Sequence, residues 1–178
     1  YSFGKKYKKK IFYIVHRSPG AGFFSNLVFV LNKLKFCEEK KLTPVIDMKN
    51  FPTLYNHPNK NYNIWDKFFK NINKFNLKDV YKSHNVIIDN TSIPRDNLYL
   101  TGKDFIKFKK RIIPRSKIIK KVNIFHKKYF NKKDKILGIH FRGTDYKTAA
   151  GHPFPPTKKI MLEFVKKILS KYRYNKIF

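Results

Sequence analysis

An imidazole and a guanidinium, from His140 and Arg142, lie two residues apart where a short apolar run ends in a polar loop. Residues 136–141 are apolar and partly β-branched and follow a charged cluster, which predicts a short buried strand. Because side chains alternate between the two faces of a strand, His140 and Arg142 share one face. A planar cation beyond the carboxyl end of a strand suits a phosphate or a carboxylate, which it can hold with two parallel hydrogen bonds.

The loop after this strand contains Gly143, Thr144 and Asp145. On the residues alone, two interpretations stay open. One is an anion-binding site built on Arg142. The other is a pair of surface residues in which Arg142 forms an ion pair with Asp145.

A second candidate is the loop Pro19-Gly20-Ala21-Gly22, which precedes a segment with near-helical apolar spacing at Phe24, Leu27, Val28, Leu31, Leu34 and Cys37. Glycines let the backbone approach a phosphate closely, and a helix N-terminus offers N–H donors and a partial positive charge. An ordinary tight turn is the alternative. The loop is neither a complete G-x-G-x-x-G nor a Walker A motif, since no Gly-Lys-Ser/Thr follows it.

The elements that must position these residues alternate between strands and helices, which predicts an α/β fold. Strands are predicted at 11–15, 43–48, 86–89, 98–100, 136–141 and 174–178. Helices are predicted at 23–40, at 103–111, after Pro114 and after the N-cap Thr157. The order strand, glycine loop, helix, strand opens a doubly wound domain, and the same order returns in the second half. A lysine-rich hinge at 131–135 divides the predicted domains, 1–133 and 134–178.

The charge is extreme, at +30 for 178 residues, and it comes almost entirely from lysine, because only six residues are arginine. The lysines are spread along the chain rather than gathered in one tract, which favours a solvated lysine surface. Attraction to an anionic membrane, an anionic donor substrate or nucleic acid also fits the charge, which does not choose among them. The chain has no zinc-finger or RNP-like motif, so nucleic acid is not the expected partner, although a basic nucleic-acid-binding protein stays the alternative.

Cys37 is the only cysteine, which excludes an intrachain disulfide and a cysteine-rich zinc site and fits a reducing compartment. No run approaches the ~18 consecutive apolar residues of a membrane span, so we expect a cytoplasmic or membrane-peripheral protein. Tyr1 is not an initiator residue, and residues 174–178 read as the first half of a strand. We therefore expect a fragment of a longer chain, cut within its second domain.

Four segments, at 20–27, 38–47, 63–69 and 140–145, together resemble one family in order and approximate spacing. The first reads Gly-Ala-Gly-Phe-Phe-Ser-Asn-Leu, the third Asn-Ile-Trp-Asp-Lys-Phe-Phe and the last His-Phe-Arg-Gly-Thr-Asp. The set resembles the superfamily of α-1,6-fucosyltransferases, nodulation fucosyltransferases and protein O-fucosyltransferases over about residues 11–178. This resemblance implies a GT-B glycosyltransferase, in which two Rossmann-like domains face each other across a cleft, with the second domain truncated here.

The activity that the resemblance implies is inverting transfer of fucose from GDP-fucose to a glycan or protein hydroxyl, with no cofactor and no metal. Arg142 would hold the diphosphate and stabilise the charge on the departing GDP, with Asp145 fixing Arg142 or organising the loop. The donor-binding residues implied in addition are His140, Thr144, Gly20, Gly22 and Asn26. Independently, the absence of an Asp-x-Asp pair fits neutralisation of the diphosphate by a fixed cation and a helix end instead of a metal.

The chain also departs from the family pattern. Gly143 stands where some members carry a second arginine, Tyr146 stands where the α-1,6 enzymes carry lysine, and residues 148–151 offer no counterpart of their downstream glutamate. The general base is therefore unassigned, with Asp47, Asp145 and His152 as candidates. An inactive sugar-nucleotide-binding relative stays a further alternative. Peripheral association with an anionic membrane is an additional expectation from the charge.

Overall fold

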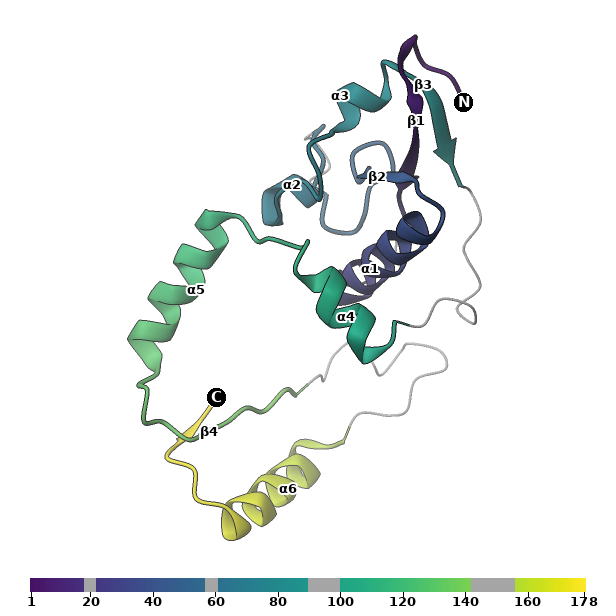
Figure 1. The fold of residues 1–178 in the computed structure, drawn as a ribbon. Helices are drawn as coiled ribbons and strands as arrows, with labels where there is room; N and C mark the ends of the chain where they lie inside the picture. The colour runs from purple at the N-terminus through teal and green to yellow at the C-terminus, as the bar shows by residue number, and fades with distance from the viewer. Residues whose placement is uncertain (18–21, 57–60, 90–99, 142–155) are drawn as a thin grey trace. The chain divides into compact units, whose positions relative to one another are not determined.

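The computed structural model describes residues 1–17, 22–56, 61–89, 100–141 and 156–178. The chain divides into two compact units, Tyr1–Lys121 and Val122–Phe178. The division falls within helix α5 (Ser116–Tyr129), whereas the sequence predicts a boundary after residue 133. That predicted boundary, between the domains 1–133 and 134–178, stays a prediction. Each unit is described by itself (Figure 1).

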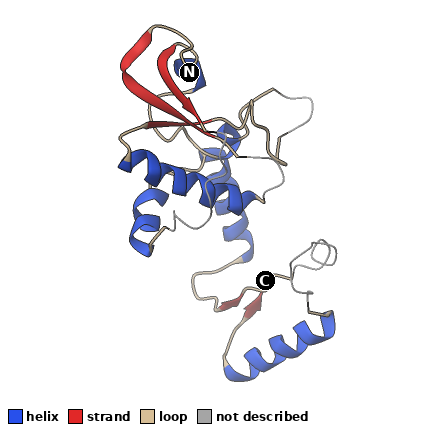
Figure 2. Cartoon of the chain, turned by 90° about the vertical axis from the view of Figure 1, so that its right-hand side faces the viewer, coloured by secondary structure: helices blue, strands red, loops and turns tan. Residues whose placement is uncertain are grey.

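The first unit is built on a three-stranded parallel sheet with the strand order β2-β1-β3 (Figure 2). Strands β1 (Lys6–Val15), β2 (Thr43–Ile46) and β3 (Ser83–Ile88) confirm the predicted apolar runs, and helix α1 (Phe23–Glu39) connects β1 to β2 as predicted. Strand β1 begins earlier than its apolar run, because Lys6 pairs with Ser83 before a shift in register. The mixture of helices with a small parallel sheet confirms the α/β class.

Each face of the sheet carries its own apolar cluster, because the side chains of β1 alternate between the faces. Tyr13 and Val15 pack with the buried side of α1 and with Trp65, while Phe12 and Ile14 pack with Val45, Val80 and Val86 on the other face. Burial of these side chains supplies the main stabilisation of the unit.

Two of the apolar residues whose spacing predicts α1, Phe24 and Val28, are 75% and 48% exposed. The buried side of the helix comprises Asn26, Val30, Leu31, Lys33, Leu34 and Cys37. A continuous apolar stripe needs spacings of three and four residues, and the spacing Leu27, Leu31, Leu34 meets that condition with Val30 beside it. Phe24 and Val28 lie on the flank of this stripe.

Three shorter helices complete the first unit, α2 (Trp65–Phe68), α3 (Leu77–Val80) and α4 (Gly102–Lys109). Helix α4 confirms the predicted helix near 103–111, and it begins with a capping box between Thr101 and Asp104. Leu100 is not in a strand, and the rest of the predicted strand 98–100 lies outside the described residues.

The second unit contains a parallel pair of short strands, β4 (Ile136–Leu137) and β5 (Lys176–Ile177), connected through helix α6 (Lys158–Lys171). Thr157 is the N-cap of α6 and its hydroxyl accepts a hydrogen bond from the Ile160 N–H at 3.3 Å, which confirms the predicted start. Strand β4 is shorter than the predicted 136–141 and is half-buried. Two residues of β4 pair with β5, and the Ile139 N–H then donates a hydrogen bond to the Phe178 carbonyl.

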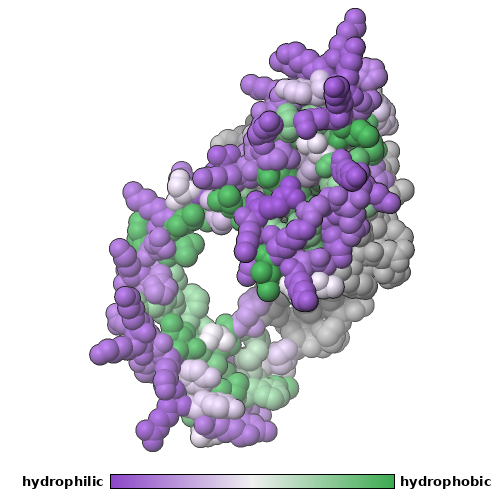
Figure 3. All heavy atoms as spheres, in the orientation of Figure 1, coloured by the Kyte–Doolittle hydropathy of each residue, from purple (hydrophilic) through white to green (hydrophobic). Residues whose placement is uncertain are grey.

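Hydrophilic side chains are distributed over the visible face of both units and do not form one patch (Figure 3). Within the ranges listed above, no helix is both long and apolar enough to cross a membrane.

Candidate functional site

The carboxyl ends of the three parallel strands meet at one edge of the first unit's sheet. His16 follows β1, Asp47 follows β2 and Asp89 follows β3, so an imidazole and two carboxylates come together there. Ligands of open α/β sheets bind beyond the carboxyl ends of the strands. This edge is therefore the candidate site of the first unit.

Asp89 is held by a buried polar network. Its Oδ2 accepts a hydrogen bond from the Tyr13 hydroxyl at 2.8 Å and lies 3.2 Å from the Lys33 Nζ, which also donates to the Tyr13 hydroxyl at 2.8 Å. Burial lowers the pKa of Lys33, and Asp89 partly offsets that shift. Burial also raises the pKa of Tyr13, with Asp89 adding to it. This network keeps one cation and one anion beneath the edge of the sheet.

Asp47 is fully buried, and its carboxylate accepts hydrogen bonds from the loop that follows it. Its Oδ1 accepts hydrogen bonds from the N–H groups of Lys49 and Asn50, at 3.0 and 2.9 Å, and its Oδ2 accepts one from the Asn50 side chain at 2.8 Å. With donors on both oxygens, the carboxylate anchors the turn after β2. The geometry argues against Asp47 as the general base, one of the roles considered from the sequence.

His16 stacks on Phe51, with ring centroids 3.8 Å apart and an interplanar angle of 18°. Burial lowers the pKa of His16, and a hydrogen bond with the Asp89 backbone and the charge of Asp47 offset part of that shift. The Nε2 atom is buried and has no hydrogen-bond partner among the described residues. His16 is therefore a neutral imidazole at neutral pH, with one ring nitrogen uncommitted.

The N-terminus of α1 adjoins this edge. Its N-cap, Gly22, provides no side-chain cap, and the first turn contains no acidic residue. A Cβ at position 22 would meet no described atom within 4 Å, and the Phe23 N–H donates to the Tyr55 hydroxyl at 2.6 Å. Nη1 of Arg17 donates to the Ser25 carbonyl and hydroxyl, at 2.7 and 2.9 Å, which fixes a guanidinium beside the first helical turn. A helix N-terminus with a fixed guanidinium can attract an anion.

The sequence-predicted residues fall in different parts of the chain. Gly22 and Asn26 lie in the first unit, where Asn26 is 5% exposed and lines a small apolar cavity of about 20 Å³ under α1. His140 lies in the second unit and is exposed. The predicted catalytic residues Arg142 and Asp145, with Gly20, Thr144 and the candidate base His152, lie outside the described residues. The structure thus brings Gly22 and Asn26 together on one helix, and the assigned roles stay predictions.

Sequence reasoning missed Asp89, Lys33 and His16 as members of the site. The signal for Asp89 and His16 was a polar residue directly after an apolar strand, as with Asp47. Lys33 had no such signal, because a lysine on an amphipathic helix normally reaches solvent. Within the described residues, no cluster of three or more histidine, cysteine, aspartate or glutamate side chains could hold a metal ion.

Comparisons with known proteins give no further guidance, because no protein-family model matches the chain and no curated protein matches its sequence.

Proposed function

We propose that the chain is a sugar-nucleotide glycosyltransferase of GT-B type, with two Rossmann-like domains, that transfers fucose from GDP-fucose to a glycan or protein hydroxyl with inversion. The observation that carries the proposal is that both units contain a parallel strand-helix-strand element, β1-α1-β2 and β4-α6-β5. In the first unit, the segment 20–27 that resembles the fucosyltransferases runs from the sequence between β1 and α1 into the start of α1. In the second unit, the segment 140–145 lies between β4 and α6 in the sequence. Both are the positions at which α/β folds bind phosphorylated ligands.

The reaction requires the departing diphosphate to be neutralised. In the proposed mechanism Arg142 takes this role with two parallel hydrogen bonds, and Thr144, Asp145 and His140 organise the donor around it. The N-terminus of α1 and the fixed Arg17 guanidinium add positive potential on the first unit. No metal enters this scheme.

The acceptor hydroxyl must lose its proton as the new glycosidic bond forms. Of the titratable groups described at the carboxyl edge of the first sheet, Asp47 is saturated with donors and Asp89 is paired with Lys33. The Nε2 atom of His16 is buried, so it does not reach an acceptor hydroxyl either. The proposal therefore keeps Asp145 and His152, the other two candidates from the sequence, for the general base.

The test is release of nucleoside diphosphate by the chain from a panel of sugar nucleotides, each with glycan and protein acceptors. Arg142→Ala is compared with the matched control Arg173→Ala, which removes an exposed guanidinium from the same unit. We expect GDP release from GDP-fucose, a loss of about 10²–10³-fold in Arg142→Ala, and no change in Arg173→Ala.

Equal turnover by Arg142→Ala and Arg173→Ala would refute the assignment of Arg142. Saturable binding of GDP-fucose without release of GDP, with any acceptor, would instead identify an inactive sugar-nucleotide-binding protein. Steep salt dependence of nucleic-acid binding, together with no affinity for any sugar nucleotide, would favour the nucleic-acid alternative.

A further inference from the structure

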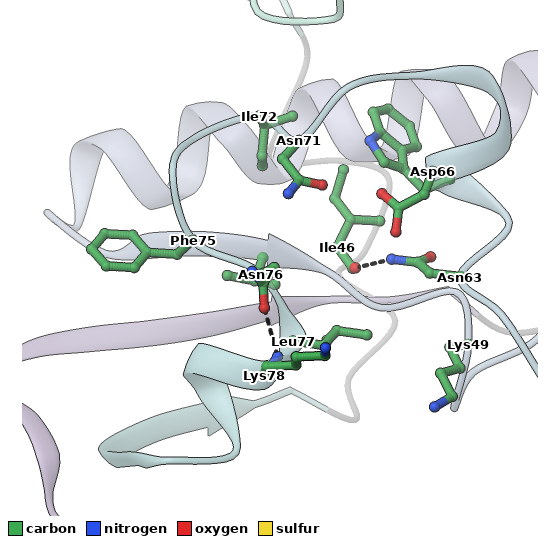
Figure 4. A pocket seen from close by; sticks show the side chains of 12 residues that line it. Ile46, Lys49, Asn63, Asp66, Asn71, Ile72, Phe75, Asn76, Leu77 and Lys78 are labelled. Atoms are coloured by element: carbon green, nitrogen blue, oxygen red, sulfur yellow. Dashed lines mark hydrogen bonds between the residues drawn. The ribbon is translucent and has the colours of Figure 1, made fainter. Parts of the chain in front are cut away.

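A cavity of about 330 Å³ lies against the outer edge of β2, away from the residues that the sequence singled out for donor binding. Val45 and Ile46 of β2 form one wall, and the segment from Asn63 to Lys78 forms the rest (Figure 4). Its volume is at the lower end of the ~300–1,000 Å³ range of small-molecule sites, so one small ring is the size of ligand that fits.

The cavity does not accept an added β-strand, because its strand edge is already occupied. The Asn63 Nδ2 donates to the Ile46 carbonyl at 2.8 Å while its Oδ1 accepts from the Met48 N–H at 3.1 Å. The Asn73 Nδ2 donates to the Pro44 carbonyl at 2.7 Å, and Pro44 has no N–H to offer. Binding of an extended peptide needs a row of unpaired backbone groups, which asparagine side chains and a proline remove here.

The groups left for a ligand are therefore side chains, and Asp66 is the most informative of them. Asp66 is an exposed residue, but partial burial of its carboxylate raises its pKa, and the charge of Arg115 offsets part of that shift. The Arg115 Nε donates at 2.9 Å to the Asp66 backbone carbonyl and not to its carboxylate. Within the described part of the chain, no hydrogen bond or ion pair reaches the carboxylate, and Figure 4 draws it at the cavity without one. An accessible carboxylate with no partner among the described residues can accept hydrogen bonds from a ligand in the cavity.

Amide groups and an apolar surface complete the lining. Asn71 makes no hydrogen bond within the described residues, and Asn76 uses its Oδ1 to cap α3 while its Nδ2 stays available. Ile72, Phe75 and Leu77 add a partly buried apolar surface. The cavity thus combines acceptors on Asp66, donors and acceptors on the asparagines, and a hydrophobic wall.

We propose that this cavity binds one neutral sugar ring of a glycan. Each sugar hydroxyl is both a donor and an acceptor, which matches amides and an unpaired carboxylate, and the C–H face of the ring matches the apolar wall. Lys49 and Lys78 also line the cavity, but lysine is about a fifth of all residues in this chain, so two lysines do not indicate an anionic ligand. The unpaired Asp66 carboxylate disfavours an anion directly. This inference stands apart from the transfer reaction, because it requires no donor.

Trp65 is the only tryptophan of the chain and lines the cavity, so its fluorescence reports binding directly. The titration uses the methyl glycosides of glucose, galactose, mannose and N-acetylglucosamine, without any sugar nucleotide. We expect at least one glycoside to saturate the signal. Asp66→Asn should weaken that binding about tenfold, because an ionised acceptor forms the stronger hydrogen bonds.

Two further variants keep the test decisive. Asn71→Ala removes an exposed side chain with no structural hydrogen bond, so it should also weaken binding while leaving the fold intact. Glu39→Gln, at the exposed end of α1 in the same unit, makes the same charge change as Asp66→Asn and should leave binding unchanged. Saturation by no glycoside, equal affinity in all variants, or displacement of the glycoside by inorganic phosphate would each overturn the proposal.

Discussion

Replacement of Lys33 by methionine tests whether the buried network beneath the sheet edge stabilises the first unit. Methionine keeps most of the length of the side chain and its contacts with the apolar cluster but removes the ammonium group. The side chain of Lys33 is 4% exposed and that of Asp89 is 21% exposed. The substitution therefore leaves the Asp89 carboxylate largely enclosed and without the Lys33 ammonium, while the Tyr13 hydroxyl still donates to it.

The magnitude follows from this exposure. Removing one partner of a fully buried ion pair costs about 3–5 kcal/mol, because the other charge is left uncompensated. Since Asp89 is partly exposed, water recovers some of that cost, and we expect Lys33→Met to lower the free energy of unfolding by about 2–4 kcal/mol. Lys35→Met is the matched control on the same helix. Its pair with Asp104, at 2.8 Å with about a fifth of each side chain exposed, should contribute only about 0.5–1 kcal/mol.

The assay is urea unfolding of the whole chain followed by the fluorescence of Trp65, which is 4% exposed and reports on the first unit. With a slope of about 1–3 kcal/mol/M, the two substitutions should shift the midpoint by clearly different amounts. The double variant Lys33→Met with Asp89→Asn closes a thermodynamic cycle, and we expect a coupling energy of about 1–3 kcal/mol.

Equal free energies of unfolding for Lys33→Met and Lys35→Met would refute the reasoning. So would a coupling energy near zero, because the network argument requires the two charges to depend on each other.

Three further predictions concern titratable groups. Burial raises the pKa of Cys37 to about 12 and the thiol is fully buried, so a thiol reagent should label the native chain only at the rate of unfolding, measured as labelling against urea. A hydrogen bond from Lys35, with others from Thr101, lowers the pKa of Asp104 from 3.8 to about 2. The ionised Asp104 therefore stabilises the folded chain fully above pH 3.8, and this contribution is lost as the pH falls through about 2. Asp104→Asn should remove that part of the acid dependence of unfolding. Burial lowers the pKa of His16 below 6.5, so its contribution to stability is present above 6.5 and lost as pH falls through the lower native value. An NMR titration of the ring should give that value, and a native pKa of 6.5 or above would contradict it.

Local patterns predicted the elements whose signals lie within a few residues. Helix α1 follows from apolar spacing, α6 from the Thr157 N-cap, and β1 and β2 from short apolar runs. Each depends on interactions between chain neighbours, such as a hydroxyl that accepts a hydrogen bond three residues on. Such interactions are visible in any single sequence.

The polar network could not be predicted in the same way. Tyr13, Lys33 and Asp89 are separated by 20 and 56 residues, and nothing in their neighbours distinguishes Lys33 from the many solvated lysines of the chain. The strand order β2-β1-β3 brings the end of β3 beside β1. Helix α1 then places the Lys33 ammonium 3.2 Å from the Asp89 carboxylate, which follows β3. Only this arrangement makes the lysine buried and the aspartate its partner.

The sequence by itself thus determined the α/β class, the glycine loop before a helix and the segments that resemble fucosyltransferases. Tertiary structure decided which side of α1 is buried. It also decided that the Asp47 carboxylate accepts hydrogen bonds within its own turn, whereas the Asp66 carboxylate, at the cavity beside β2, has no partner among the described residues. The physical reason is that propensity and periodicity act over a few residues, whereas burial and pairing depend on which distant segments the strand order brings into contact.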